Sequence, residues 1–281
     1  MRIKAFVMRK LFRAISITGG YCELNCSHCN ARYIRSMIPA IGKRLPQVLK
    51  NLHRKGVRGV LLSGGWTRDG RLPVEKHLAE LTSIKKELGM VFNVHLGLED
   101  RREVLEQARE VFDIIDFEFT LSPWLANVVR GLRQPVSQYV KVLDSMIDVG
   151  LDVVPHIFLW HPHQSLDLLK KEIEILRDRG LDKVNLLVYI PPSGHIELKV
   201  AQLLPRLLET VRTMWDKEIY IGCMRPPEAR KTLDPYAISQ GLVERIANPT
   251  VSAVRRYRDR LVFYDACCSI PERMLSYFTL D

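Results

Sequence analysis

Residues 14–30 read AISITGGYCELNCSHCN, a short β-rich run followed at once by Cys22, Cys26 and Cys29. The run at 14–18 predicts a strand, and the two glycines after it end that strand. A loop after the first strand of an α/β barrel lies at the carboxyl end of the sheet, where such barrels carry their active sites. We therefore expect the three cysteines to lie at the mouth of a barrel.

The rest of the chain continues this alternation of strands and helices. Further β-rich runs lie at 59–63, 91–96, 114–120, 153–159, 184–190 and 218–221, with a weaker eighth at 242–246. Between them, apolar residues recur at helical spacing, as in Leu169, Ile173 and Leu176. The pattern predicts an α/β fold, a (β/α)8 TIM-barrel-like barrel, complete or nearly so. We assign residues 1–250 to the barrel and 251–281 to a C-terminal extension of the same domain.

The composition is that of an ordinary globular protein. Hydrophobic residues make up 47% and charged residues 26% of the 281 residues, and the chain has no apolar stretch of about 18 residues that could span a membrane. We expect a cytoplasmic protein. The net charge of +10 favours acidic partners, but the basic residues are scattered and accompany no nucleic-acid-binding motif. Nucleic acid is therefore not the expected partner.

The six cysteines are unevenly placed, with three inside eight residues, one at 223 and two at 267 and 268. In a cytoplasmic chain this clustering indicates metal chemistry rather than structural disulfides. Three thiolates spaced C-x3-C-x2-C can hold three irons of a 4Fe–4S cluster and leave the fourth iron open. That iron can chelate the amino and carboxylate groups of S-adenosylmethionine (SAM), whose reductive cleavage yields a 5′-deoxyadenosyl radical.

Two other interpretations of the triplet stay open, a zinc site and a cluster of reactive thiols. Structural zinc takes four closely supplied ligands, and His28 could in principle be the fourth. His28 stands between two of the cysteines, where coordination would be cramped. We expect it instead to pack against the cluster or SAM.

This triplet is the signature of the radical SAM superfamily, which the chain resembles. Ser63, Gly64 and Gly65 end the second strand, where members carry a glycine-rich motif whose backbone meets the SAM amino group. Glycine allows such a close approach of the main chain. An acidic residue often follows in the superfamily; here the residue is Trp66. A plain turn between strand and helix is the alternative interpretation of this motif.

The run Phe119-Thr120-Leu121-Ser122-Pro123, followed by Arg133 and then Tyr139, resembles the fourth strand and following helix of biotin synthase. This resemblance implies that Glu118, Thr120 and Arg133 contact the ribose and carboxylate of SAM, and that His156 lies on the strand against which adenine stacks. His95 ends the third strand and is expected either to contact SAM or substrate or to line the barrel as a structural histidine.

A wider resemblance covers nearly the whole chain. CELNCSHCNARYIRSM, GVLLSGGWTRDGRLPV, YIPPSG and IGCMRP are similar to a biotin-synthase-like group that includes one subunit of the two-subunit archaeal-type lipoyl synthase. The resemblance implies sulfur insertion at C6 or C8 of an octanoyl chain on a lysine of a lipoyl-carrier protein domain, or of an octanoyl-lysine peptide. It also implies a second radical SAM subunit as partner, and a basic surface suits an acidic carrier domain.

The remaining cysteines bear on this function. Cys223 follows the seventh strand, and the extension with Cys267 and Cys268 can fold back across the barrel mouth. Together they are candidate ligands of an auxiliary 4Fe–4S cluster that donates the sulfur, with Ser269, Arg225 or a partner residue as its fourth ligand. The alternatives are buried apolar thiols, radical SAM chemistry of another kind (rearrangement or C–C bond formation), and a non-catalytic, zinc-stabilised nucleic-acid binder.

Overall fold

The computed structural model describes residues 2–280, which form one curled sheet of 11 parallel strands. The sheet order is β11-β1-β10-β9-β8-β7-β6-β5-β4-β2-β3. All eight expected strands are present, with these bounds: β2 Phe12–Ser16, β4 Gly59–Ser63, β5 Val91–Val94, β6 Ile114–Glu118, β7 Val153–Trp160, β8 Lys183–Val188, β9 Glu218–Ile221 and β10 Arg245–Ala247. The sequence patterns missed three further strands: β1 Ile3–Phe6, β3 Ile38–Pro39 and β11 Leu261–Tyr264.

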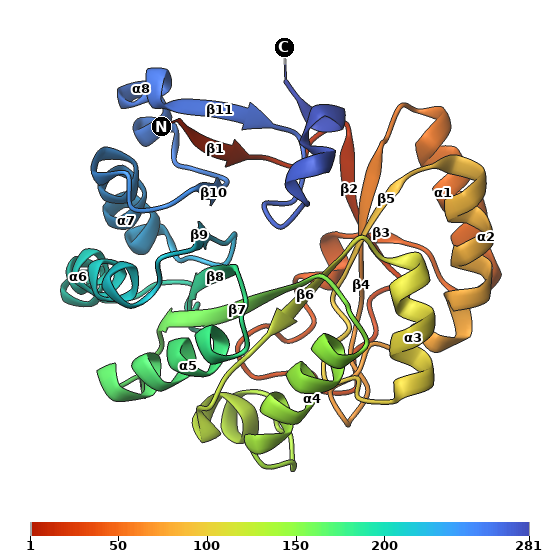
Figure 1. Ribbon diagram of the computed structural model, residues 1–281, viewed down its shortest axis with the longest axis horizontal. Coiled ribbons are helices and arrows are strands. Elements are labelled where there is room, and N and C mark those ends of the chain that lie inside the picture. The colour runs from red at the N-terminus through yellow and green to blue at the C-terminus, as the bar shows by residue number, and fades with distance from the viewer. Residues whose placement is uncertain (1, 281) are drawn as a thin grey trace.

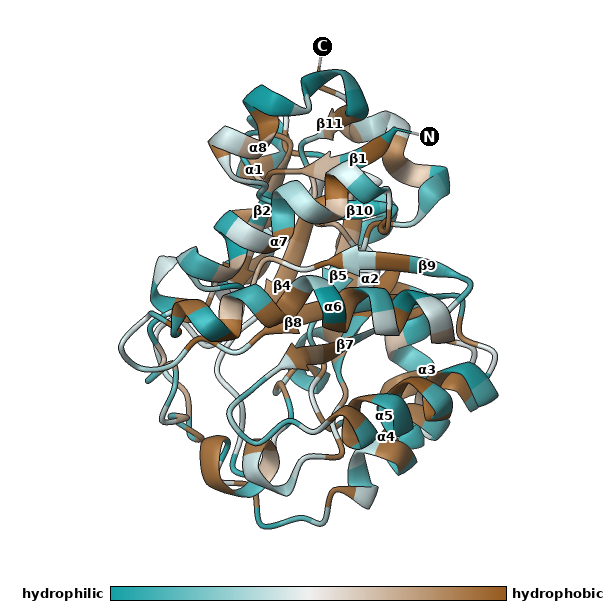
Figure 2. Cartoon of the chain, turned by 90° about the vertical axis from the view of Figure 1, so that its left-hand side faces the viewer, coloured by the Kyte–Doolittle hydropathy of each residue, from teal (hydrophilic) through white to brown (hydrophobic). Residues whose placement is uncertain are grey.

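Helices cover the outside of the sheet, so that the strands curl around an interior (Figure 1). They are α1 Leu45–Arg54, α2 Leu78–Leu88, α3 Arg102–Val111, α4 Ser137–Asp148, α5 Leu166–Asp178, α6 Leu198–Met214, α7 Pro227–Gln240 and α8 Val251–Arg256. Parallel strands buried on both faces need such a cover, and their apolar residues appear as brown strands inside more polar helices in Figure 2. The expected α/β barrel is confirmed.

The apolar stripe expected on α5 is buried as predicted, since Leu169, Ile173 and Leu176 all face the sheet. On α4 the buried residues are Tyr139, Val142, Leu143 and Met146, and the ring centroid of Tyr139 lies 6.4 Å from that of Phe117 on β6. The large aromatic side chain sets which face of this helix is covered.

The barrel is not closed by strand pairing, since in residues 2–280 no ladder joins β1 or β11 to β2. The C-terminal segment lies in this gap, between β1 and β2 in Figure 1. Its short helix η6 (Glu272–Phe278) brings Phe278 against Phe12 of β2, with ring centroids 5.6 Å apart. The stretch after residue 250 therefore forms the edge strand β11 and also fills the gap between β1 and β2.

The buried carboxylate of Asp265 fixes the C-terminal segment to the loop that connects β1 to β2. It accepts the backbone N–H groups of Arg9, Lys10 and Leu11 at 2.6, 2.6 and 2.9 Å. Three charge-assisted hydrogen bonds to one carboxylate form a strong anchor, and it stands two residues before Cys267. Among the described residues, no helix is both long and apolar enough to cross a membrane.

Candidate iron–sulfur and SAM site

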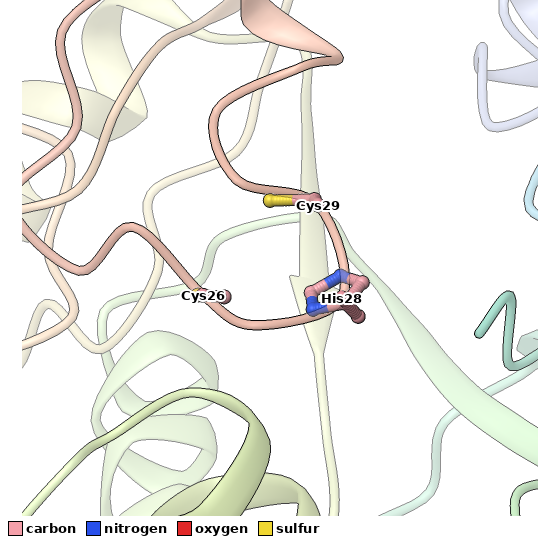
Figure 3. Close-up of side chains that lie close together, drawn as sticks. All are labelled: Cys26, His28 and Cys29. Atoms are coloured by element: carbon pink, nitrogen blue, oxygen red, sulfur yellow. The ribbon is translucent and has the colours of Figure 1, made fainter. Parts of the chain in front are cut away.

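The three N-terminal cysteines lie on the loop after β2, as expected from the sequence. The loop reverses sharply, with Asn25, Asn30 and Ala31 in the left-handed region at φ of 42°, 48° and 55°. The ligand atoms of Cys26, His28 and Cys29 all lie within 4.8 Å of one another, on one turn of the loop (Figure 3). Two thiols and an imidazole within this distance are a donor set that suits a transition metal or an iron–sulfur cluster.

Cys22 is held by the end of the neighbouring strand β4. The backbone N–H of Trp66 points at the Cys22 sulfur across 3.3 Å, and Gly65 N–H donates to the Thr18 hydroxyl at 2.6 Å. A Cβ on Gly65 would come within 1.9 Å of the Tyr21 carbonyl oxygen. The glycine pair therefore lies at the predicted strand end, and in this structure Gly65 is required because the cysteine loop packs directly against it.

A buried guanidinium stands beside the cysteines, and it belongs to Arg130. Arg130 forms a two-pronged ion pair with Glu118 at the end of β6, with its Nε 2.9 Å from Glu118 Oε1. It also lies 5.8 Å from the centre of the Trp66 ring, and its backbone oxygen is 3.9 Å from the Cys26 sulfur. Arg133, the residue expected to meet the SAM carboxylate, is exposed. Of the two arginines, Arg130 is the one that the structure places beside the cysteines.

His28 is buried and faces Arg130, whose Nη1 lies 3.0 Å from His28 Nε2. Burial and the charge of Arg130 lower the pKa of His28 to about 3, so that the ring is neutral and Nε2 accepts. Its Nδ1 has no hydrogen-bond partner in the described part of the chain. Hydrogen bonding to Cys26 lowers the pKa of the Cys29 thiol to about 6, which favours the thiolate that metal binding requires.

Thr120 faces a helix, because its hydroxyl donates to the buried carboxyl of Glu172 on α5 at 3.0 Å. Glu172 also accepts the backbone N–H of Leu121 at 2.7 Å, and burial raises its pKa to about 7. This contact fixes the turn that leads from β6 into the π-helix η4 (Trp124–Val129), which ends just before Arg130.

Deeper in the barrel, strands β5 to β8 contribute a polar group centred on Asp116. Asp116 accepts from Asn93 Nδ2 at 2.9 Å, and His95 Nε2 lies 3.3 Å away. Burial opposes ionisation, but the imidazoles of His156 and His95 offset this effect, and the pKa of Asp116 falls to about 2. Ser63 joins the group through its hydroxyl, 3.2 Å from His95 Nδ1.

His156, the candidate for the adenine-stacking strand, is likewise tied into this interior group. Its Nδ1 lies 2.9 Å from the carbonyl oxygen of Val154, and its Nε2 lies 2.7 Å from Nδ2 of Asn185 on β8. Both ring nitrogens are therefore occupied by protein partners.

The three later cysteines meet at the same interior group. The Cys267 thiol donates to Asp116 at 3.8 Å, and Asn185 Nδ2 points at the Cys268 sulfur at 3.5 Å. Burial and the nearby Cys268 raise the pKa of Cys223 to about 11, although the Cys223 side chain is solvent-accessible. The sequence positions alone did not require that these cysteines converge.

The surroundings of Cys223, Cys267 and Cys268 fit an iron–sulfur cluster. Arg245 donates to the Cys268 carbonyl oxygen at 3.0 Å, and Arg225 lies near Cys223, so two guanidinium groups can offset the negative charge of thiolates. The Ser269 hydroxyl and Arg225 Nη1 are buried and have no hydrogen-bond partner within residues 2–280. Soft thiol donors beside unpartnered polar atoms are what a bound group of this kind would use.

The sequence reasoning missed four polar residues of the interior: Asn93, Asp116, Arg130 and Asn185. One of them had a readable signal, because Asp116, like the predicted Glu118, alternates with Ile115 and Phe117 on β6, and period-two alternation places both on the other face of the strand. No comparable signal singled out Arg130, since its position depends on the irregular turn of η4.

Comparison with known proteins was informative at the level of structure only. No protein-family model matches the chain, and no curated protein sequence does either. Methylornithine synthase (PylB) superposes with a TM-score of 0.57 at 15% identity, over 88% of this chain and 72% of that protein. HydG, a maturase of FeFe-hydrogenase, gives 0.62 at 12% identity over 98% and 68%.

SuiB from Streptococcus suis, in a structure bound to S-adenosylmethionine, gives a TM-score of 0.57 at 14% identity over 89% of this chain. The chain spans about half the length of SuiB, 49%. This chain has the fold of these three proteins. At such low identity the likeness establishes the architecture, while the chemistry has to be argued from the side chains.

Proposed function

We propose that the chain is a radical SAM enzyme whose SAM-binding 4Fe–4S cluster is held by Cys22, Cys26 and Cys29. The observation that carries this proposal is the C-x3-C-x2-C loop at the mouth of the barrel, packed against the glycine pair that ends β4. The shared fold with a protein whose structure contains S-adenosylmethionine adds support. When bound, the cluster and SAM supply a 5′-deoxyadenosyl radical.

The protein's own groups would bind and orient SAM. The Arg130 guanidinium can bind a carboxylate, and an ion pair with Glu118 holds it beside Cys26. Only 8% of the Arg130 side chain and 13% of the Glu118 side chain are exposed. The Trp66 ring lies against the guanidinium on another side. Ser63 and Gly64 at the end of β4 are the proposed contacts of the SAM amino group, and the β6–β7 edge that carries Glu118 and His156 is the proposed side for ribose and adenine.

We further propose that the reaction inserts sulfur into an octanoyl chain carried by a lipoyl-carrier domain. A sulfur donor and a radical source have to face one substrate. Two side chains on the same side of β6 support this proposal. Asp116 contacts Cys267. Glu118 contacts Arg130, which lies beside Cys26. Cys223, Cys267 and Cys268 would hold the auxiliary 4Fe–4S cluster, with Ser269, Arg225 or a partner residue as fourth ligand.

The proposed partners are the carrier domain and a second radical SAM subunit. The net charge of +10 suits an acidic carrier, since complementary charge speeds encounter and aids selection.

An anaerobic assay with octanoyl-lysine peptide, SAM and a reductant, run with and without the candidate second subunit, tests the proposal. We expect 5′-deoxyadenosine together with a thiolated peptide in mass spectra. Formation of 5′-deoxyadenosine without peptide thiolation under either condition would refute octanoyl sulfur insertion and keep the radical chemistry. A reconstituted protein that contains zinc, lacks the iron–sulfur absorption near 400 nm and never cleaves SAM would refute both.

A further inference from the structure

Glu172 on α5 carries a buried carboxyl that no cation of the described chain neutralises. Only 1% of the residue is exposed, and burial raises its pKa. The groups that oppose this rise are the backbone N–H of Leu121, the hydroxyl of Thr120 and the amide of Gln164, all of them uncharged. Burying a carboxyl without a cation is unfavourable unless its hydrogen bonds compensate. This carboxyl binds the start of the turn that follows β6, so its effect on the molecule passes through that turn.

A continuous series of hydrogen bonds leads from Glu172 to Arg130. The Thr120 hydroxyl donates to Glu172 Oε1 at 3.0 Å and accepts the backbone N–H of Ser122 at 3.0 Å. The Ser122 hydroxyl accepts the N–H of Leu125 at 3.3 Å, and the Leu125 carbonyl oxygen accepts the N–H of Arg130 at 3.0 Å. Each group acts in a role that its chemistry allows, because a hydroxyl can donate one hydrogen bond and accept others. The carboxyl on α5 is thus connected to the backbone of the arginine beside the cysteines.

The helical turn η4, which lies between these ends, has little stability of its own. It is a single turn of π-helix, which is a rare form, and short isolated helices are marginal in water. The first N–H groups of a helix also lack partners inside it, and here Glu172, Thr120 and Ser122 supply such partners. The position of η4 therefore depends on these contacts more than on its own hydrogen bonds.

The other end of η4 reaches the cysteine loop. The Val129 carbonyl oxygen accepts the N–H of Ser27 at 3.2 Å, and the Arg130 carbonyl oxygen lies 3.9 Å from the Cys26 sulfur. A displacement of η4 at its α5 end would therefore move the Arg130 guanidinium and loosen the contacts of the loop around Cys26.

We propose that Glu172 is a positioning residue for SAM binding, which fixes the Arg130 guanidinium beside Cys26 through Thr120 and η4. Glu172 acts only by holding the turn and needs no contact with SAM or with a cysteine. Its role in SAM binding rests on the proposed function, whereas its control of η4 does not.

Amide hydrogen exchange of the full-length protein tests the control of η4 directly. Glu172→Met keeps the side-chain length and removes both acceptor oxygens, and it should speed exchange in residues 121–130 about tenfold or more. Glu172→Gln keeps one acceptor oxygen for Thr120 and Leu121, so exchange should stay within about threefold of the wild type. Glu174→Met, at an exposed carboxyl on the same helix, should leave exchange in this segment unchanged.

Calorimetric titration of the anaerobically reconstituted protein with SAM tests the positioning role. Glu172→Met should raise the Kd for SAM about tenfold, because a displaced guanidinium loses its hydrogen bonds to the SAM carboxylate. Glu172→Gln should restore the Kd to within about threefold of the wild type, and Glu174→Met should not change it. A merely structural role of Glu172 would lower the number of binding sites per chain and leave the Kd of the folded fraction unchanged.

Thr120→Val breaks the connection without changing the carboxyl, and Thr120→Ser, which keeps the hydroxyl, is its matched control. Thr120→Val should share both defects of Glu172→Met, and Thr120→Ser should restore both quantities to near the wild-type values. Wild-type exchange rates in residues 121–130, or a wild-type Kd for SAM, in both Glu172→Met and Thr120→Val would overturn the inference. Failure of the proposed radical chemistry appears instead as a wild-type protein that neither binds nor cleaves SAM, so the two failures are distinguishable.

Discussion

Asp116 and Glu118 lie two residues apart on β6 and connect the two groups of cysteines. Both side chains point into the barrel, about 6–7 Å apart along the strand. Glu118 holds Arg130 beside Cys26, and Asp116 accepts the thiol of Cys267. A single strand thus places the first cysteine group and the C-terminal one on one interior, which is the relationship that the proposed radical source and the proposed sulfur donor require.

Arg130 rather than Arg133 should govern SAM binding. Arg130→Met leaves Glu118 without its partner, which costs about 3–5 kcal/mol of stability for a buried pair and removes the proposed carboxylate contact. Arg133→Met changes an exposed side chain and should alter stability by less than about 0.5 kcal/mol. Equilibrium binding of SAM and the yield of 5′-deoxyadenosine measure the difference.

Arg130→Lys serves as the control that keeps the charge and should retain part of the SAM affinity. Equal loss of SAM binding in the Arg130→Met and Arg133→Met variants would contradict the assignment.

Gly65→Ala should abolish loading of the first cluster. The added Cβ would meet the Tyr21 carbonyl at 1.9 Å, and so the loop that carries Cys22 has to move. We expect a stability loss of about 1–3 kcal/mol, typical of overpacking, and a loss of cluster iron. Gly20→Ala in the same loop is the matched control, because its Cβ meets Arg35 Cγ at an ordinary 3.6 Å. Iron analysis after anaerobic reconstitution decides; equal loading of the two variants would refute the packing argument.

Asp265→Asn should release the C-terminal cysteines from their anchor. The loss of charge weakens three hydrogen bonds to residues 9–11, and we expect unfolding to become easier by about 1.5–3 kcal/mol. The second cluster should be lost while the first remains, which iron counting and SAM cleavage report separately. Asp259→Asn, at an exposed carboxylate in the same segment, should change neither quantity. Retention of all the iron in Asp265→Asn would show that the anchor is not needed.

Glu172 should make stability fall as pH rises. Its folded pKa of about 7 lies above its ordinary value of 4.5, so its contribution is fully present below pH 4.5 and is lost as pH rises through 7. The wild type should lose up to about 3 kcal/mol across this range relative to Glu172→Gln, which keeps an acceptor for Thr120 and Leu121. Denaturant unfolding of both proteins at several pH values gives the difference, and parallel stability curves would disprove it.

The strand–helix order was predictable because strongly apolar runs such as 59–63 and 153–159 are buried from both sides. The strands β1 and β11 were not, because they are short, border charged residues and pair with each other over most of the chain length. Their pairing is a property of the whole sheet rather than of the local sequence.

The residues of the candidate site likewise fall into those that the sequence predicts and those that it does not. Cys22, Cys26 and Cys29 were predictable from spacing, since a loop of fixed position presents them together. Arg130 was not, because η4 is a π-helix and Gly131 follows Arg130 with φ of 69°, which turns Arg133 away to the surface. The meeting of Cys267 with Asp116 likewise depends on the C-terminal segment filling the gap between β1 and β2.

Iron counting tests the central claim, two clusters on one barrel interior, most directly. The wild type and the Cys223→Ala/Cys267→Ala/Cys268→Ala variant are reconstituted anaerobically and assayed for iron, sulfide and 5′-deoxyadenosine. The two-cluster account predicts about eight irons per wild-type chain, about four in the variant, and SAM cleavage in both. About four irons in both proteins would contradict it and leave the C-terminal cysteines without a cluster.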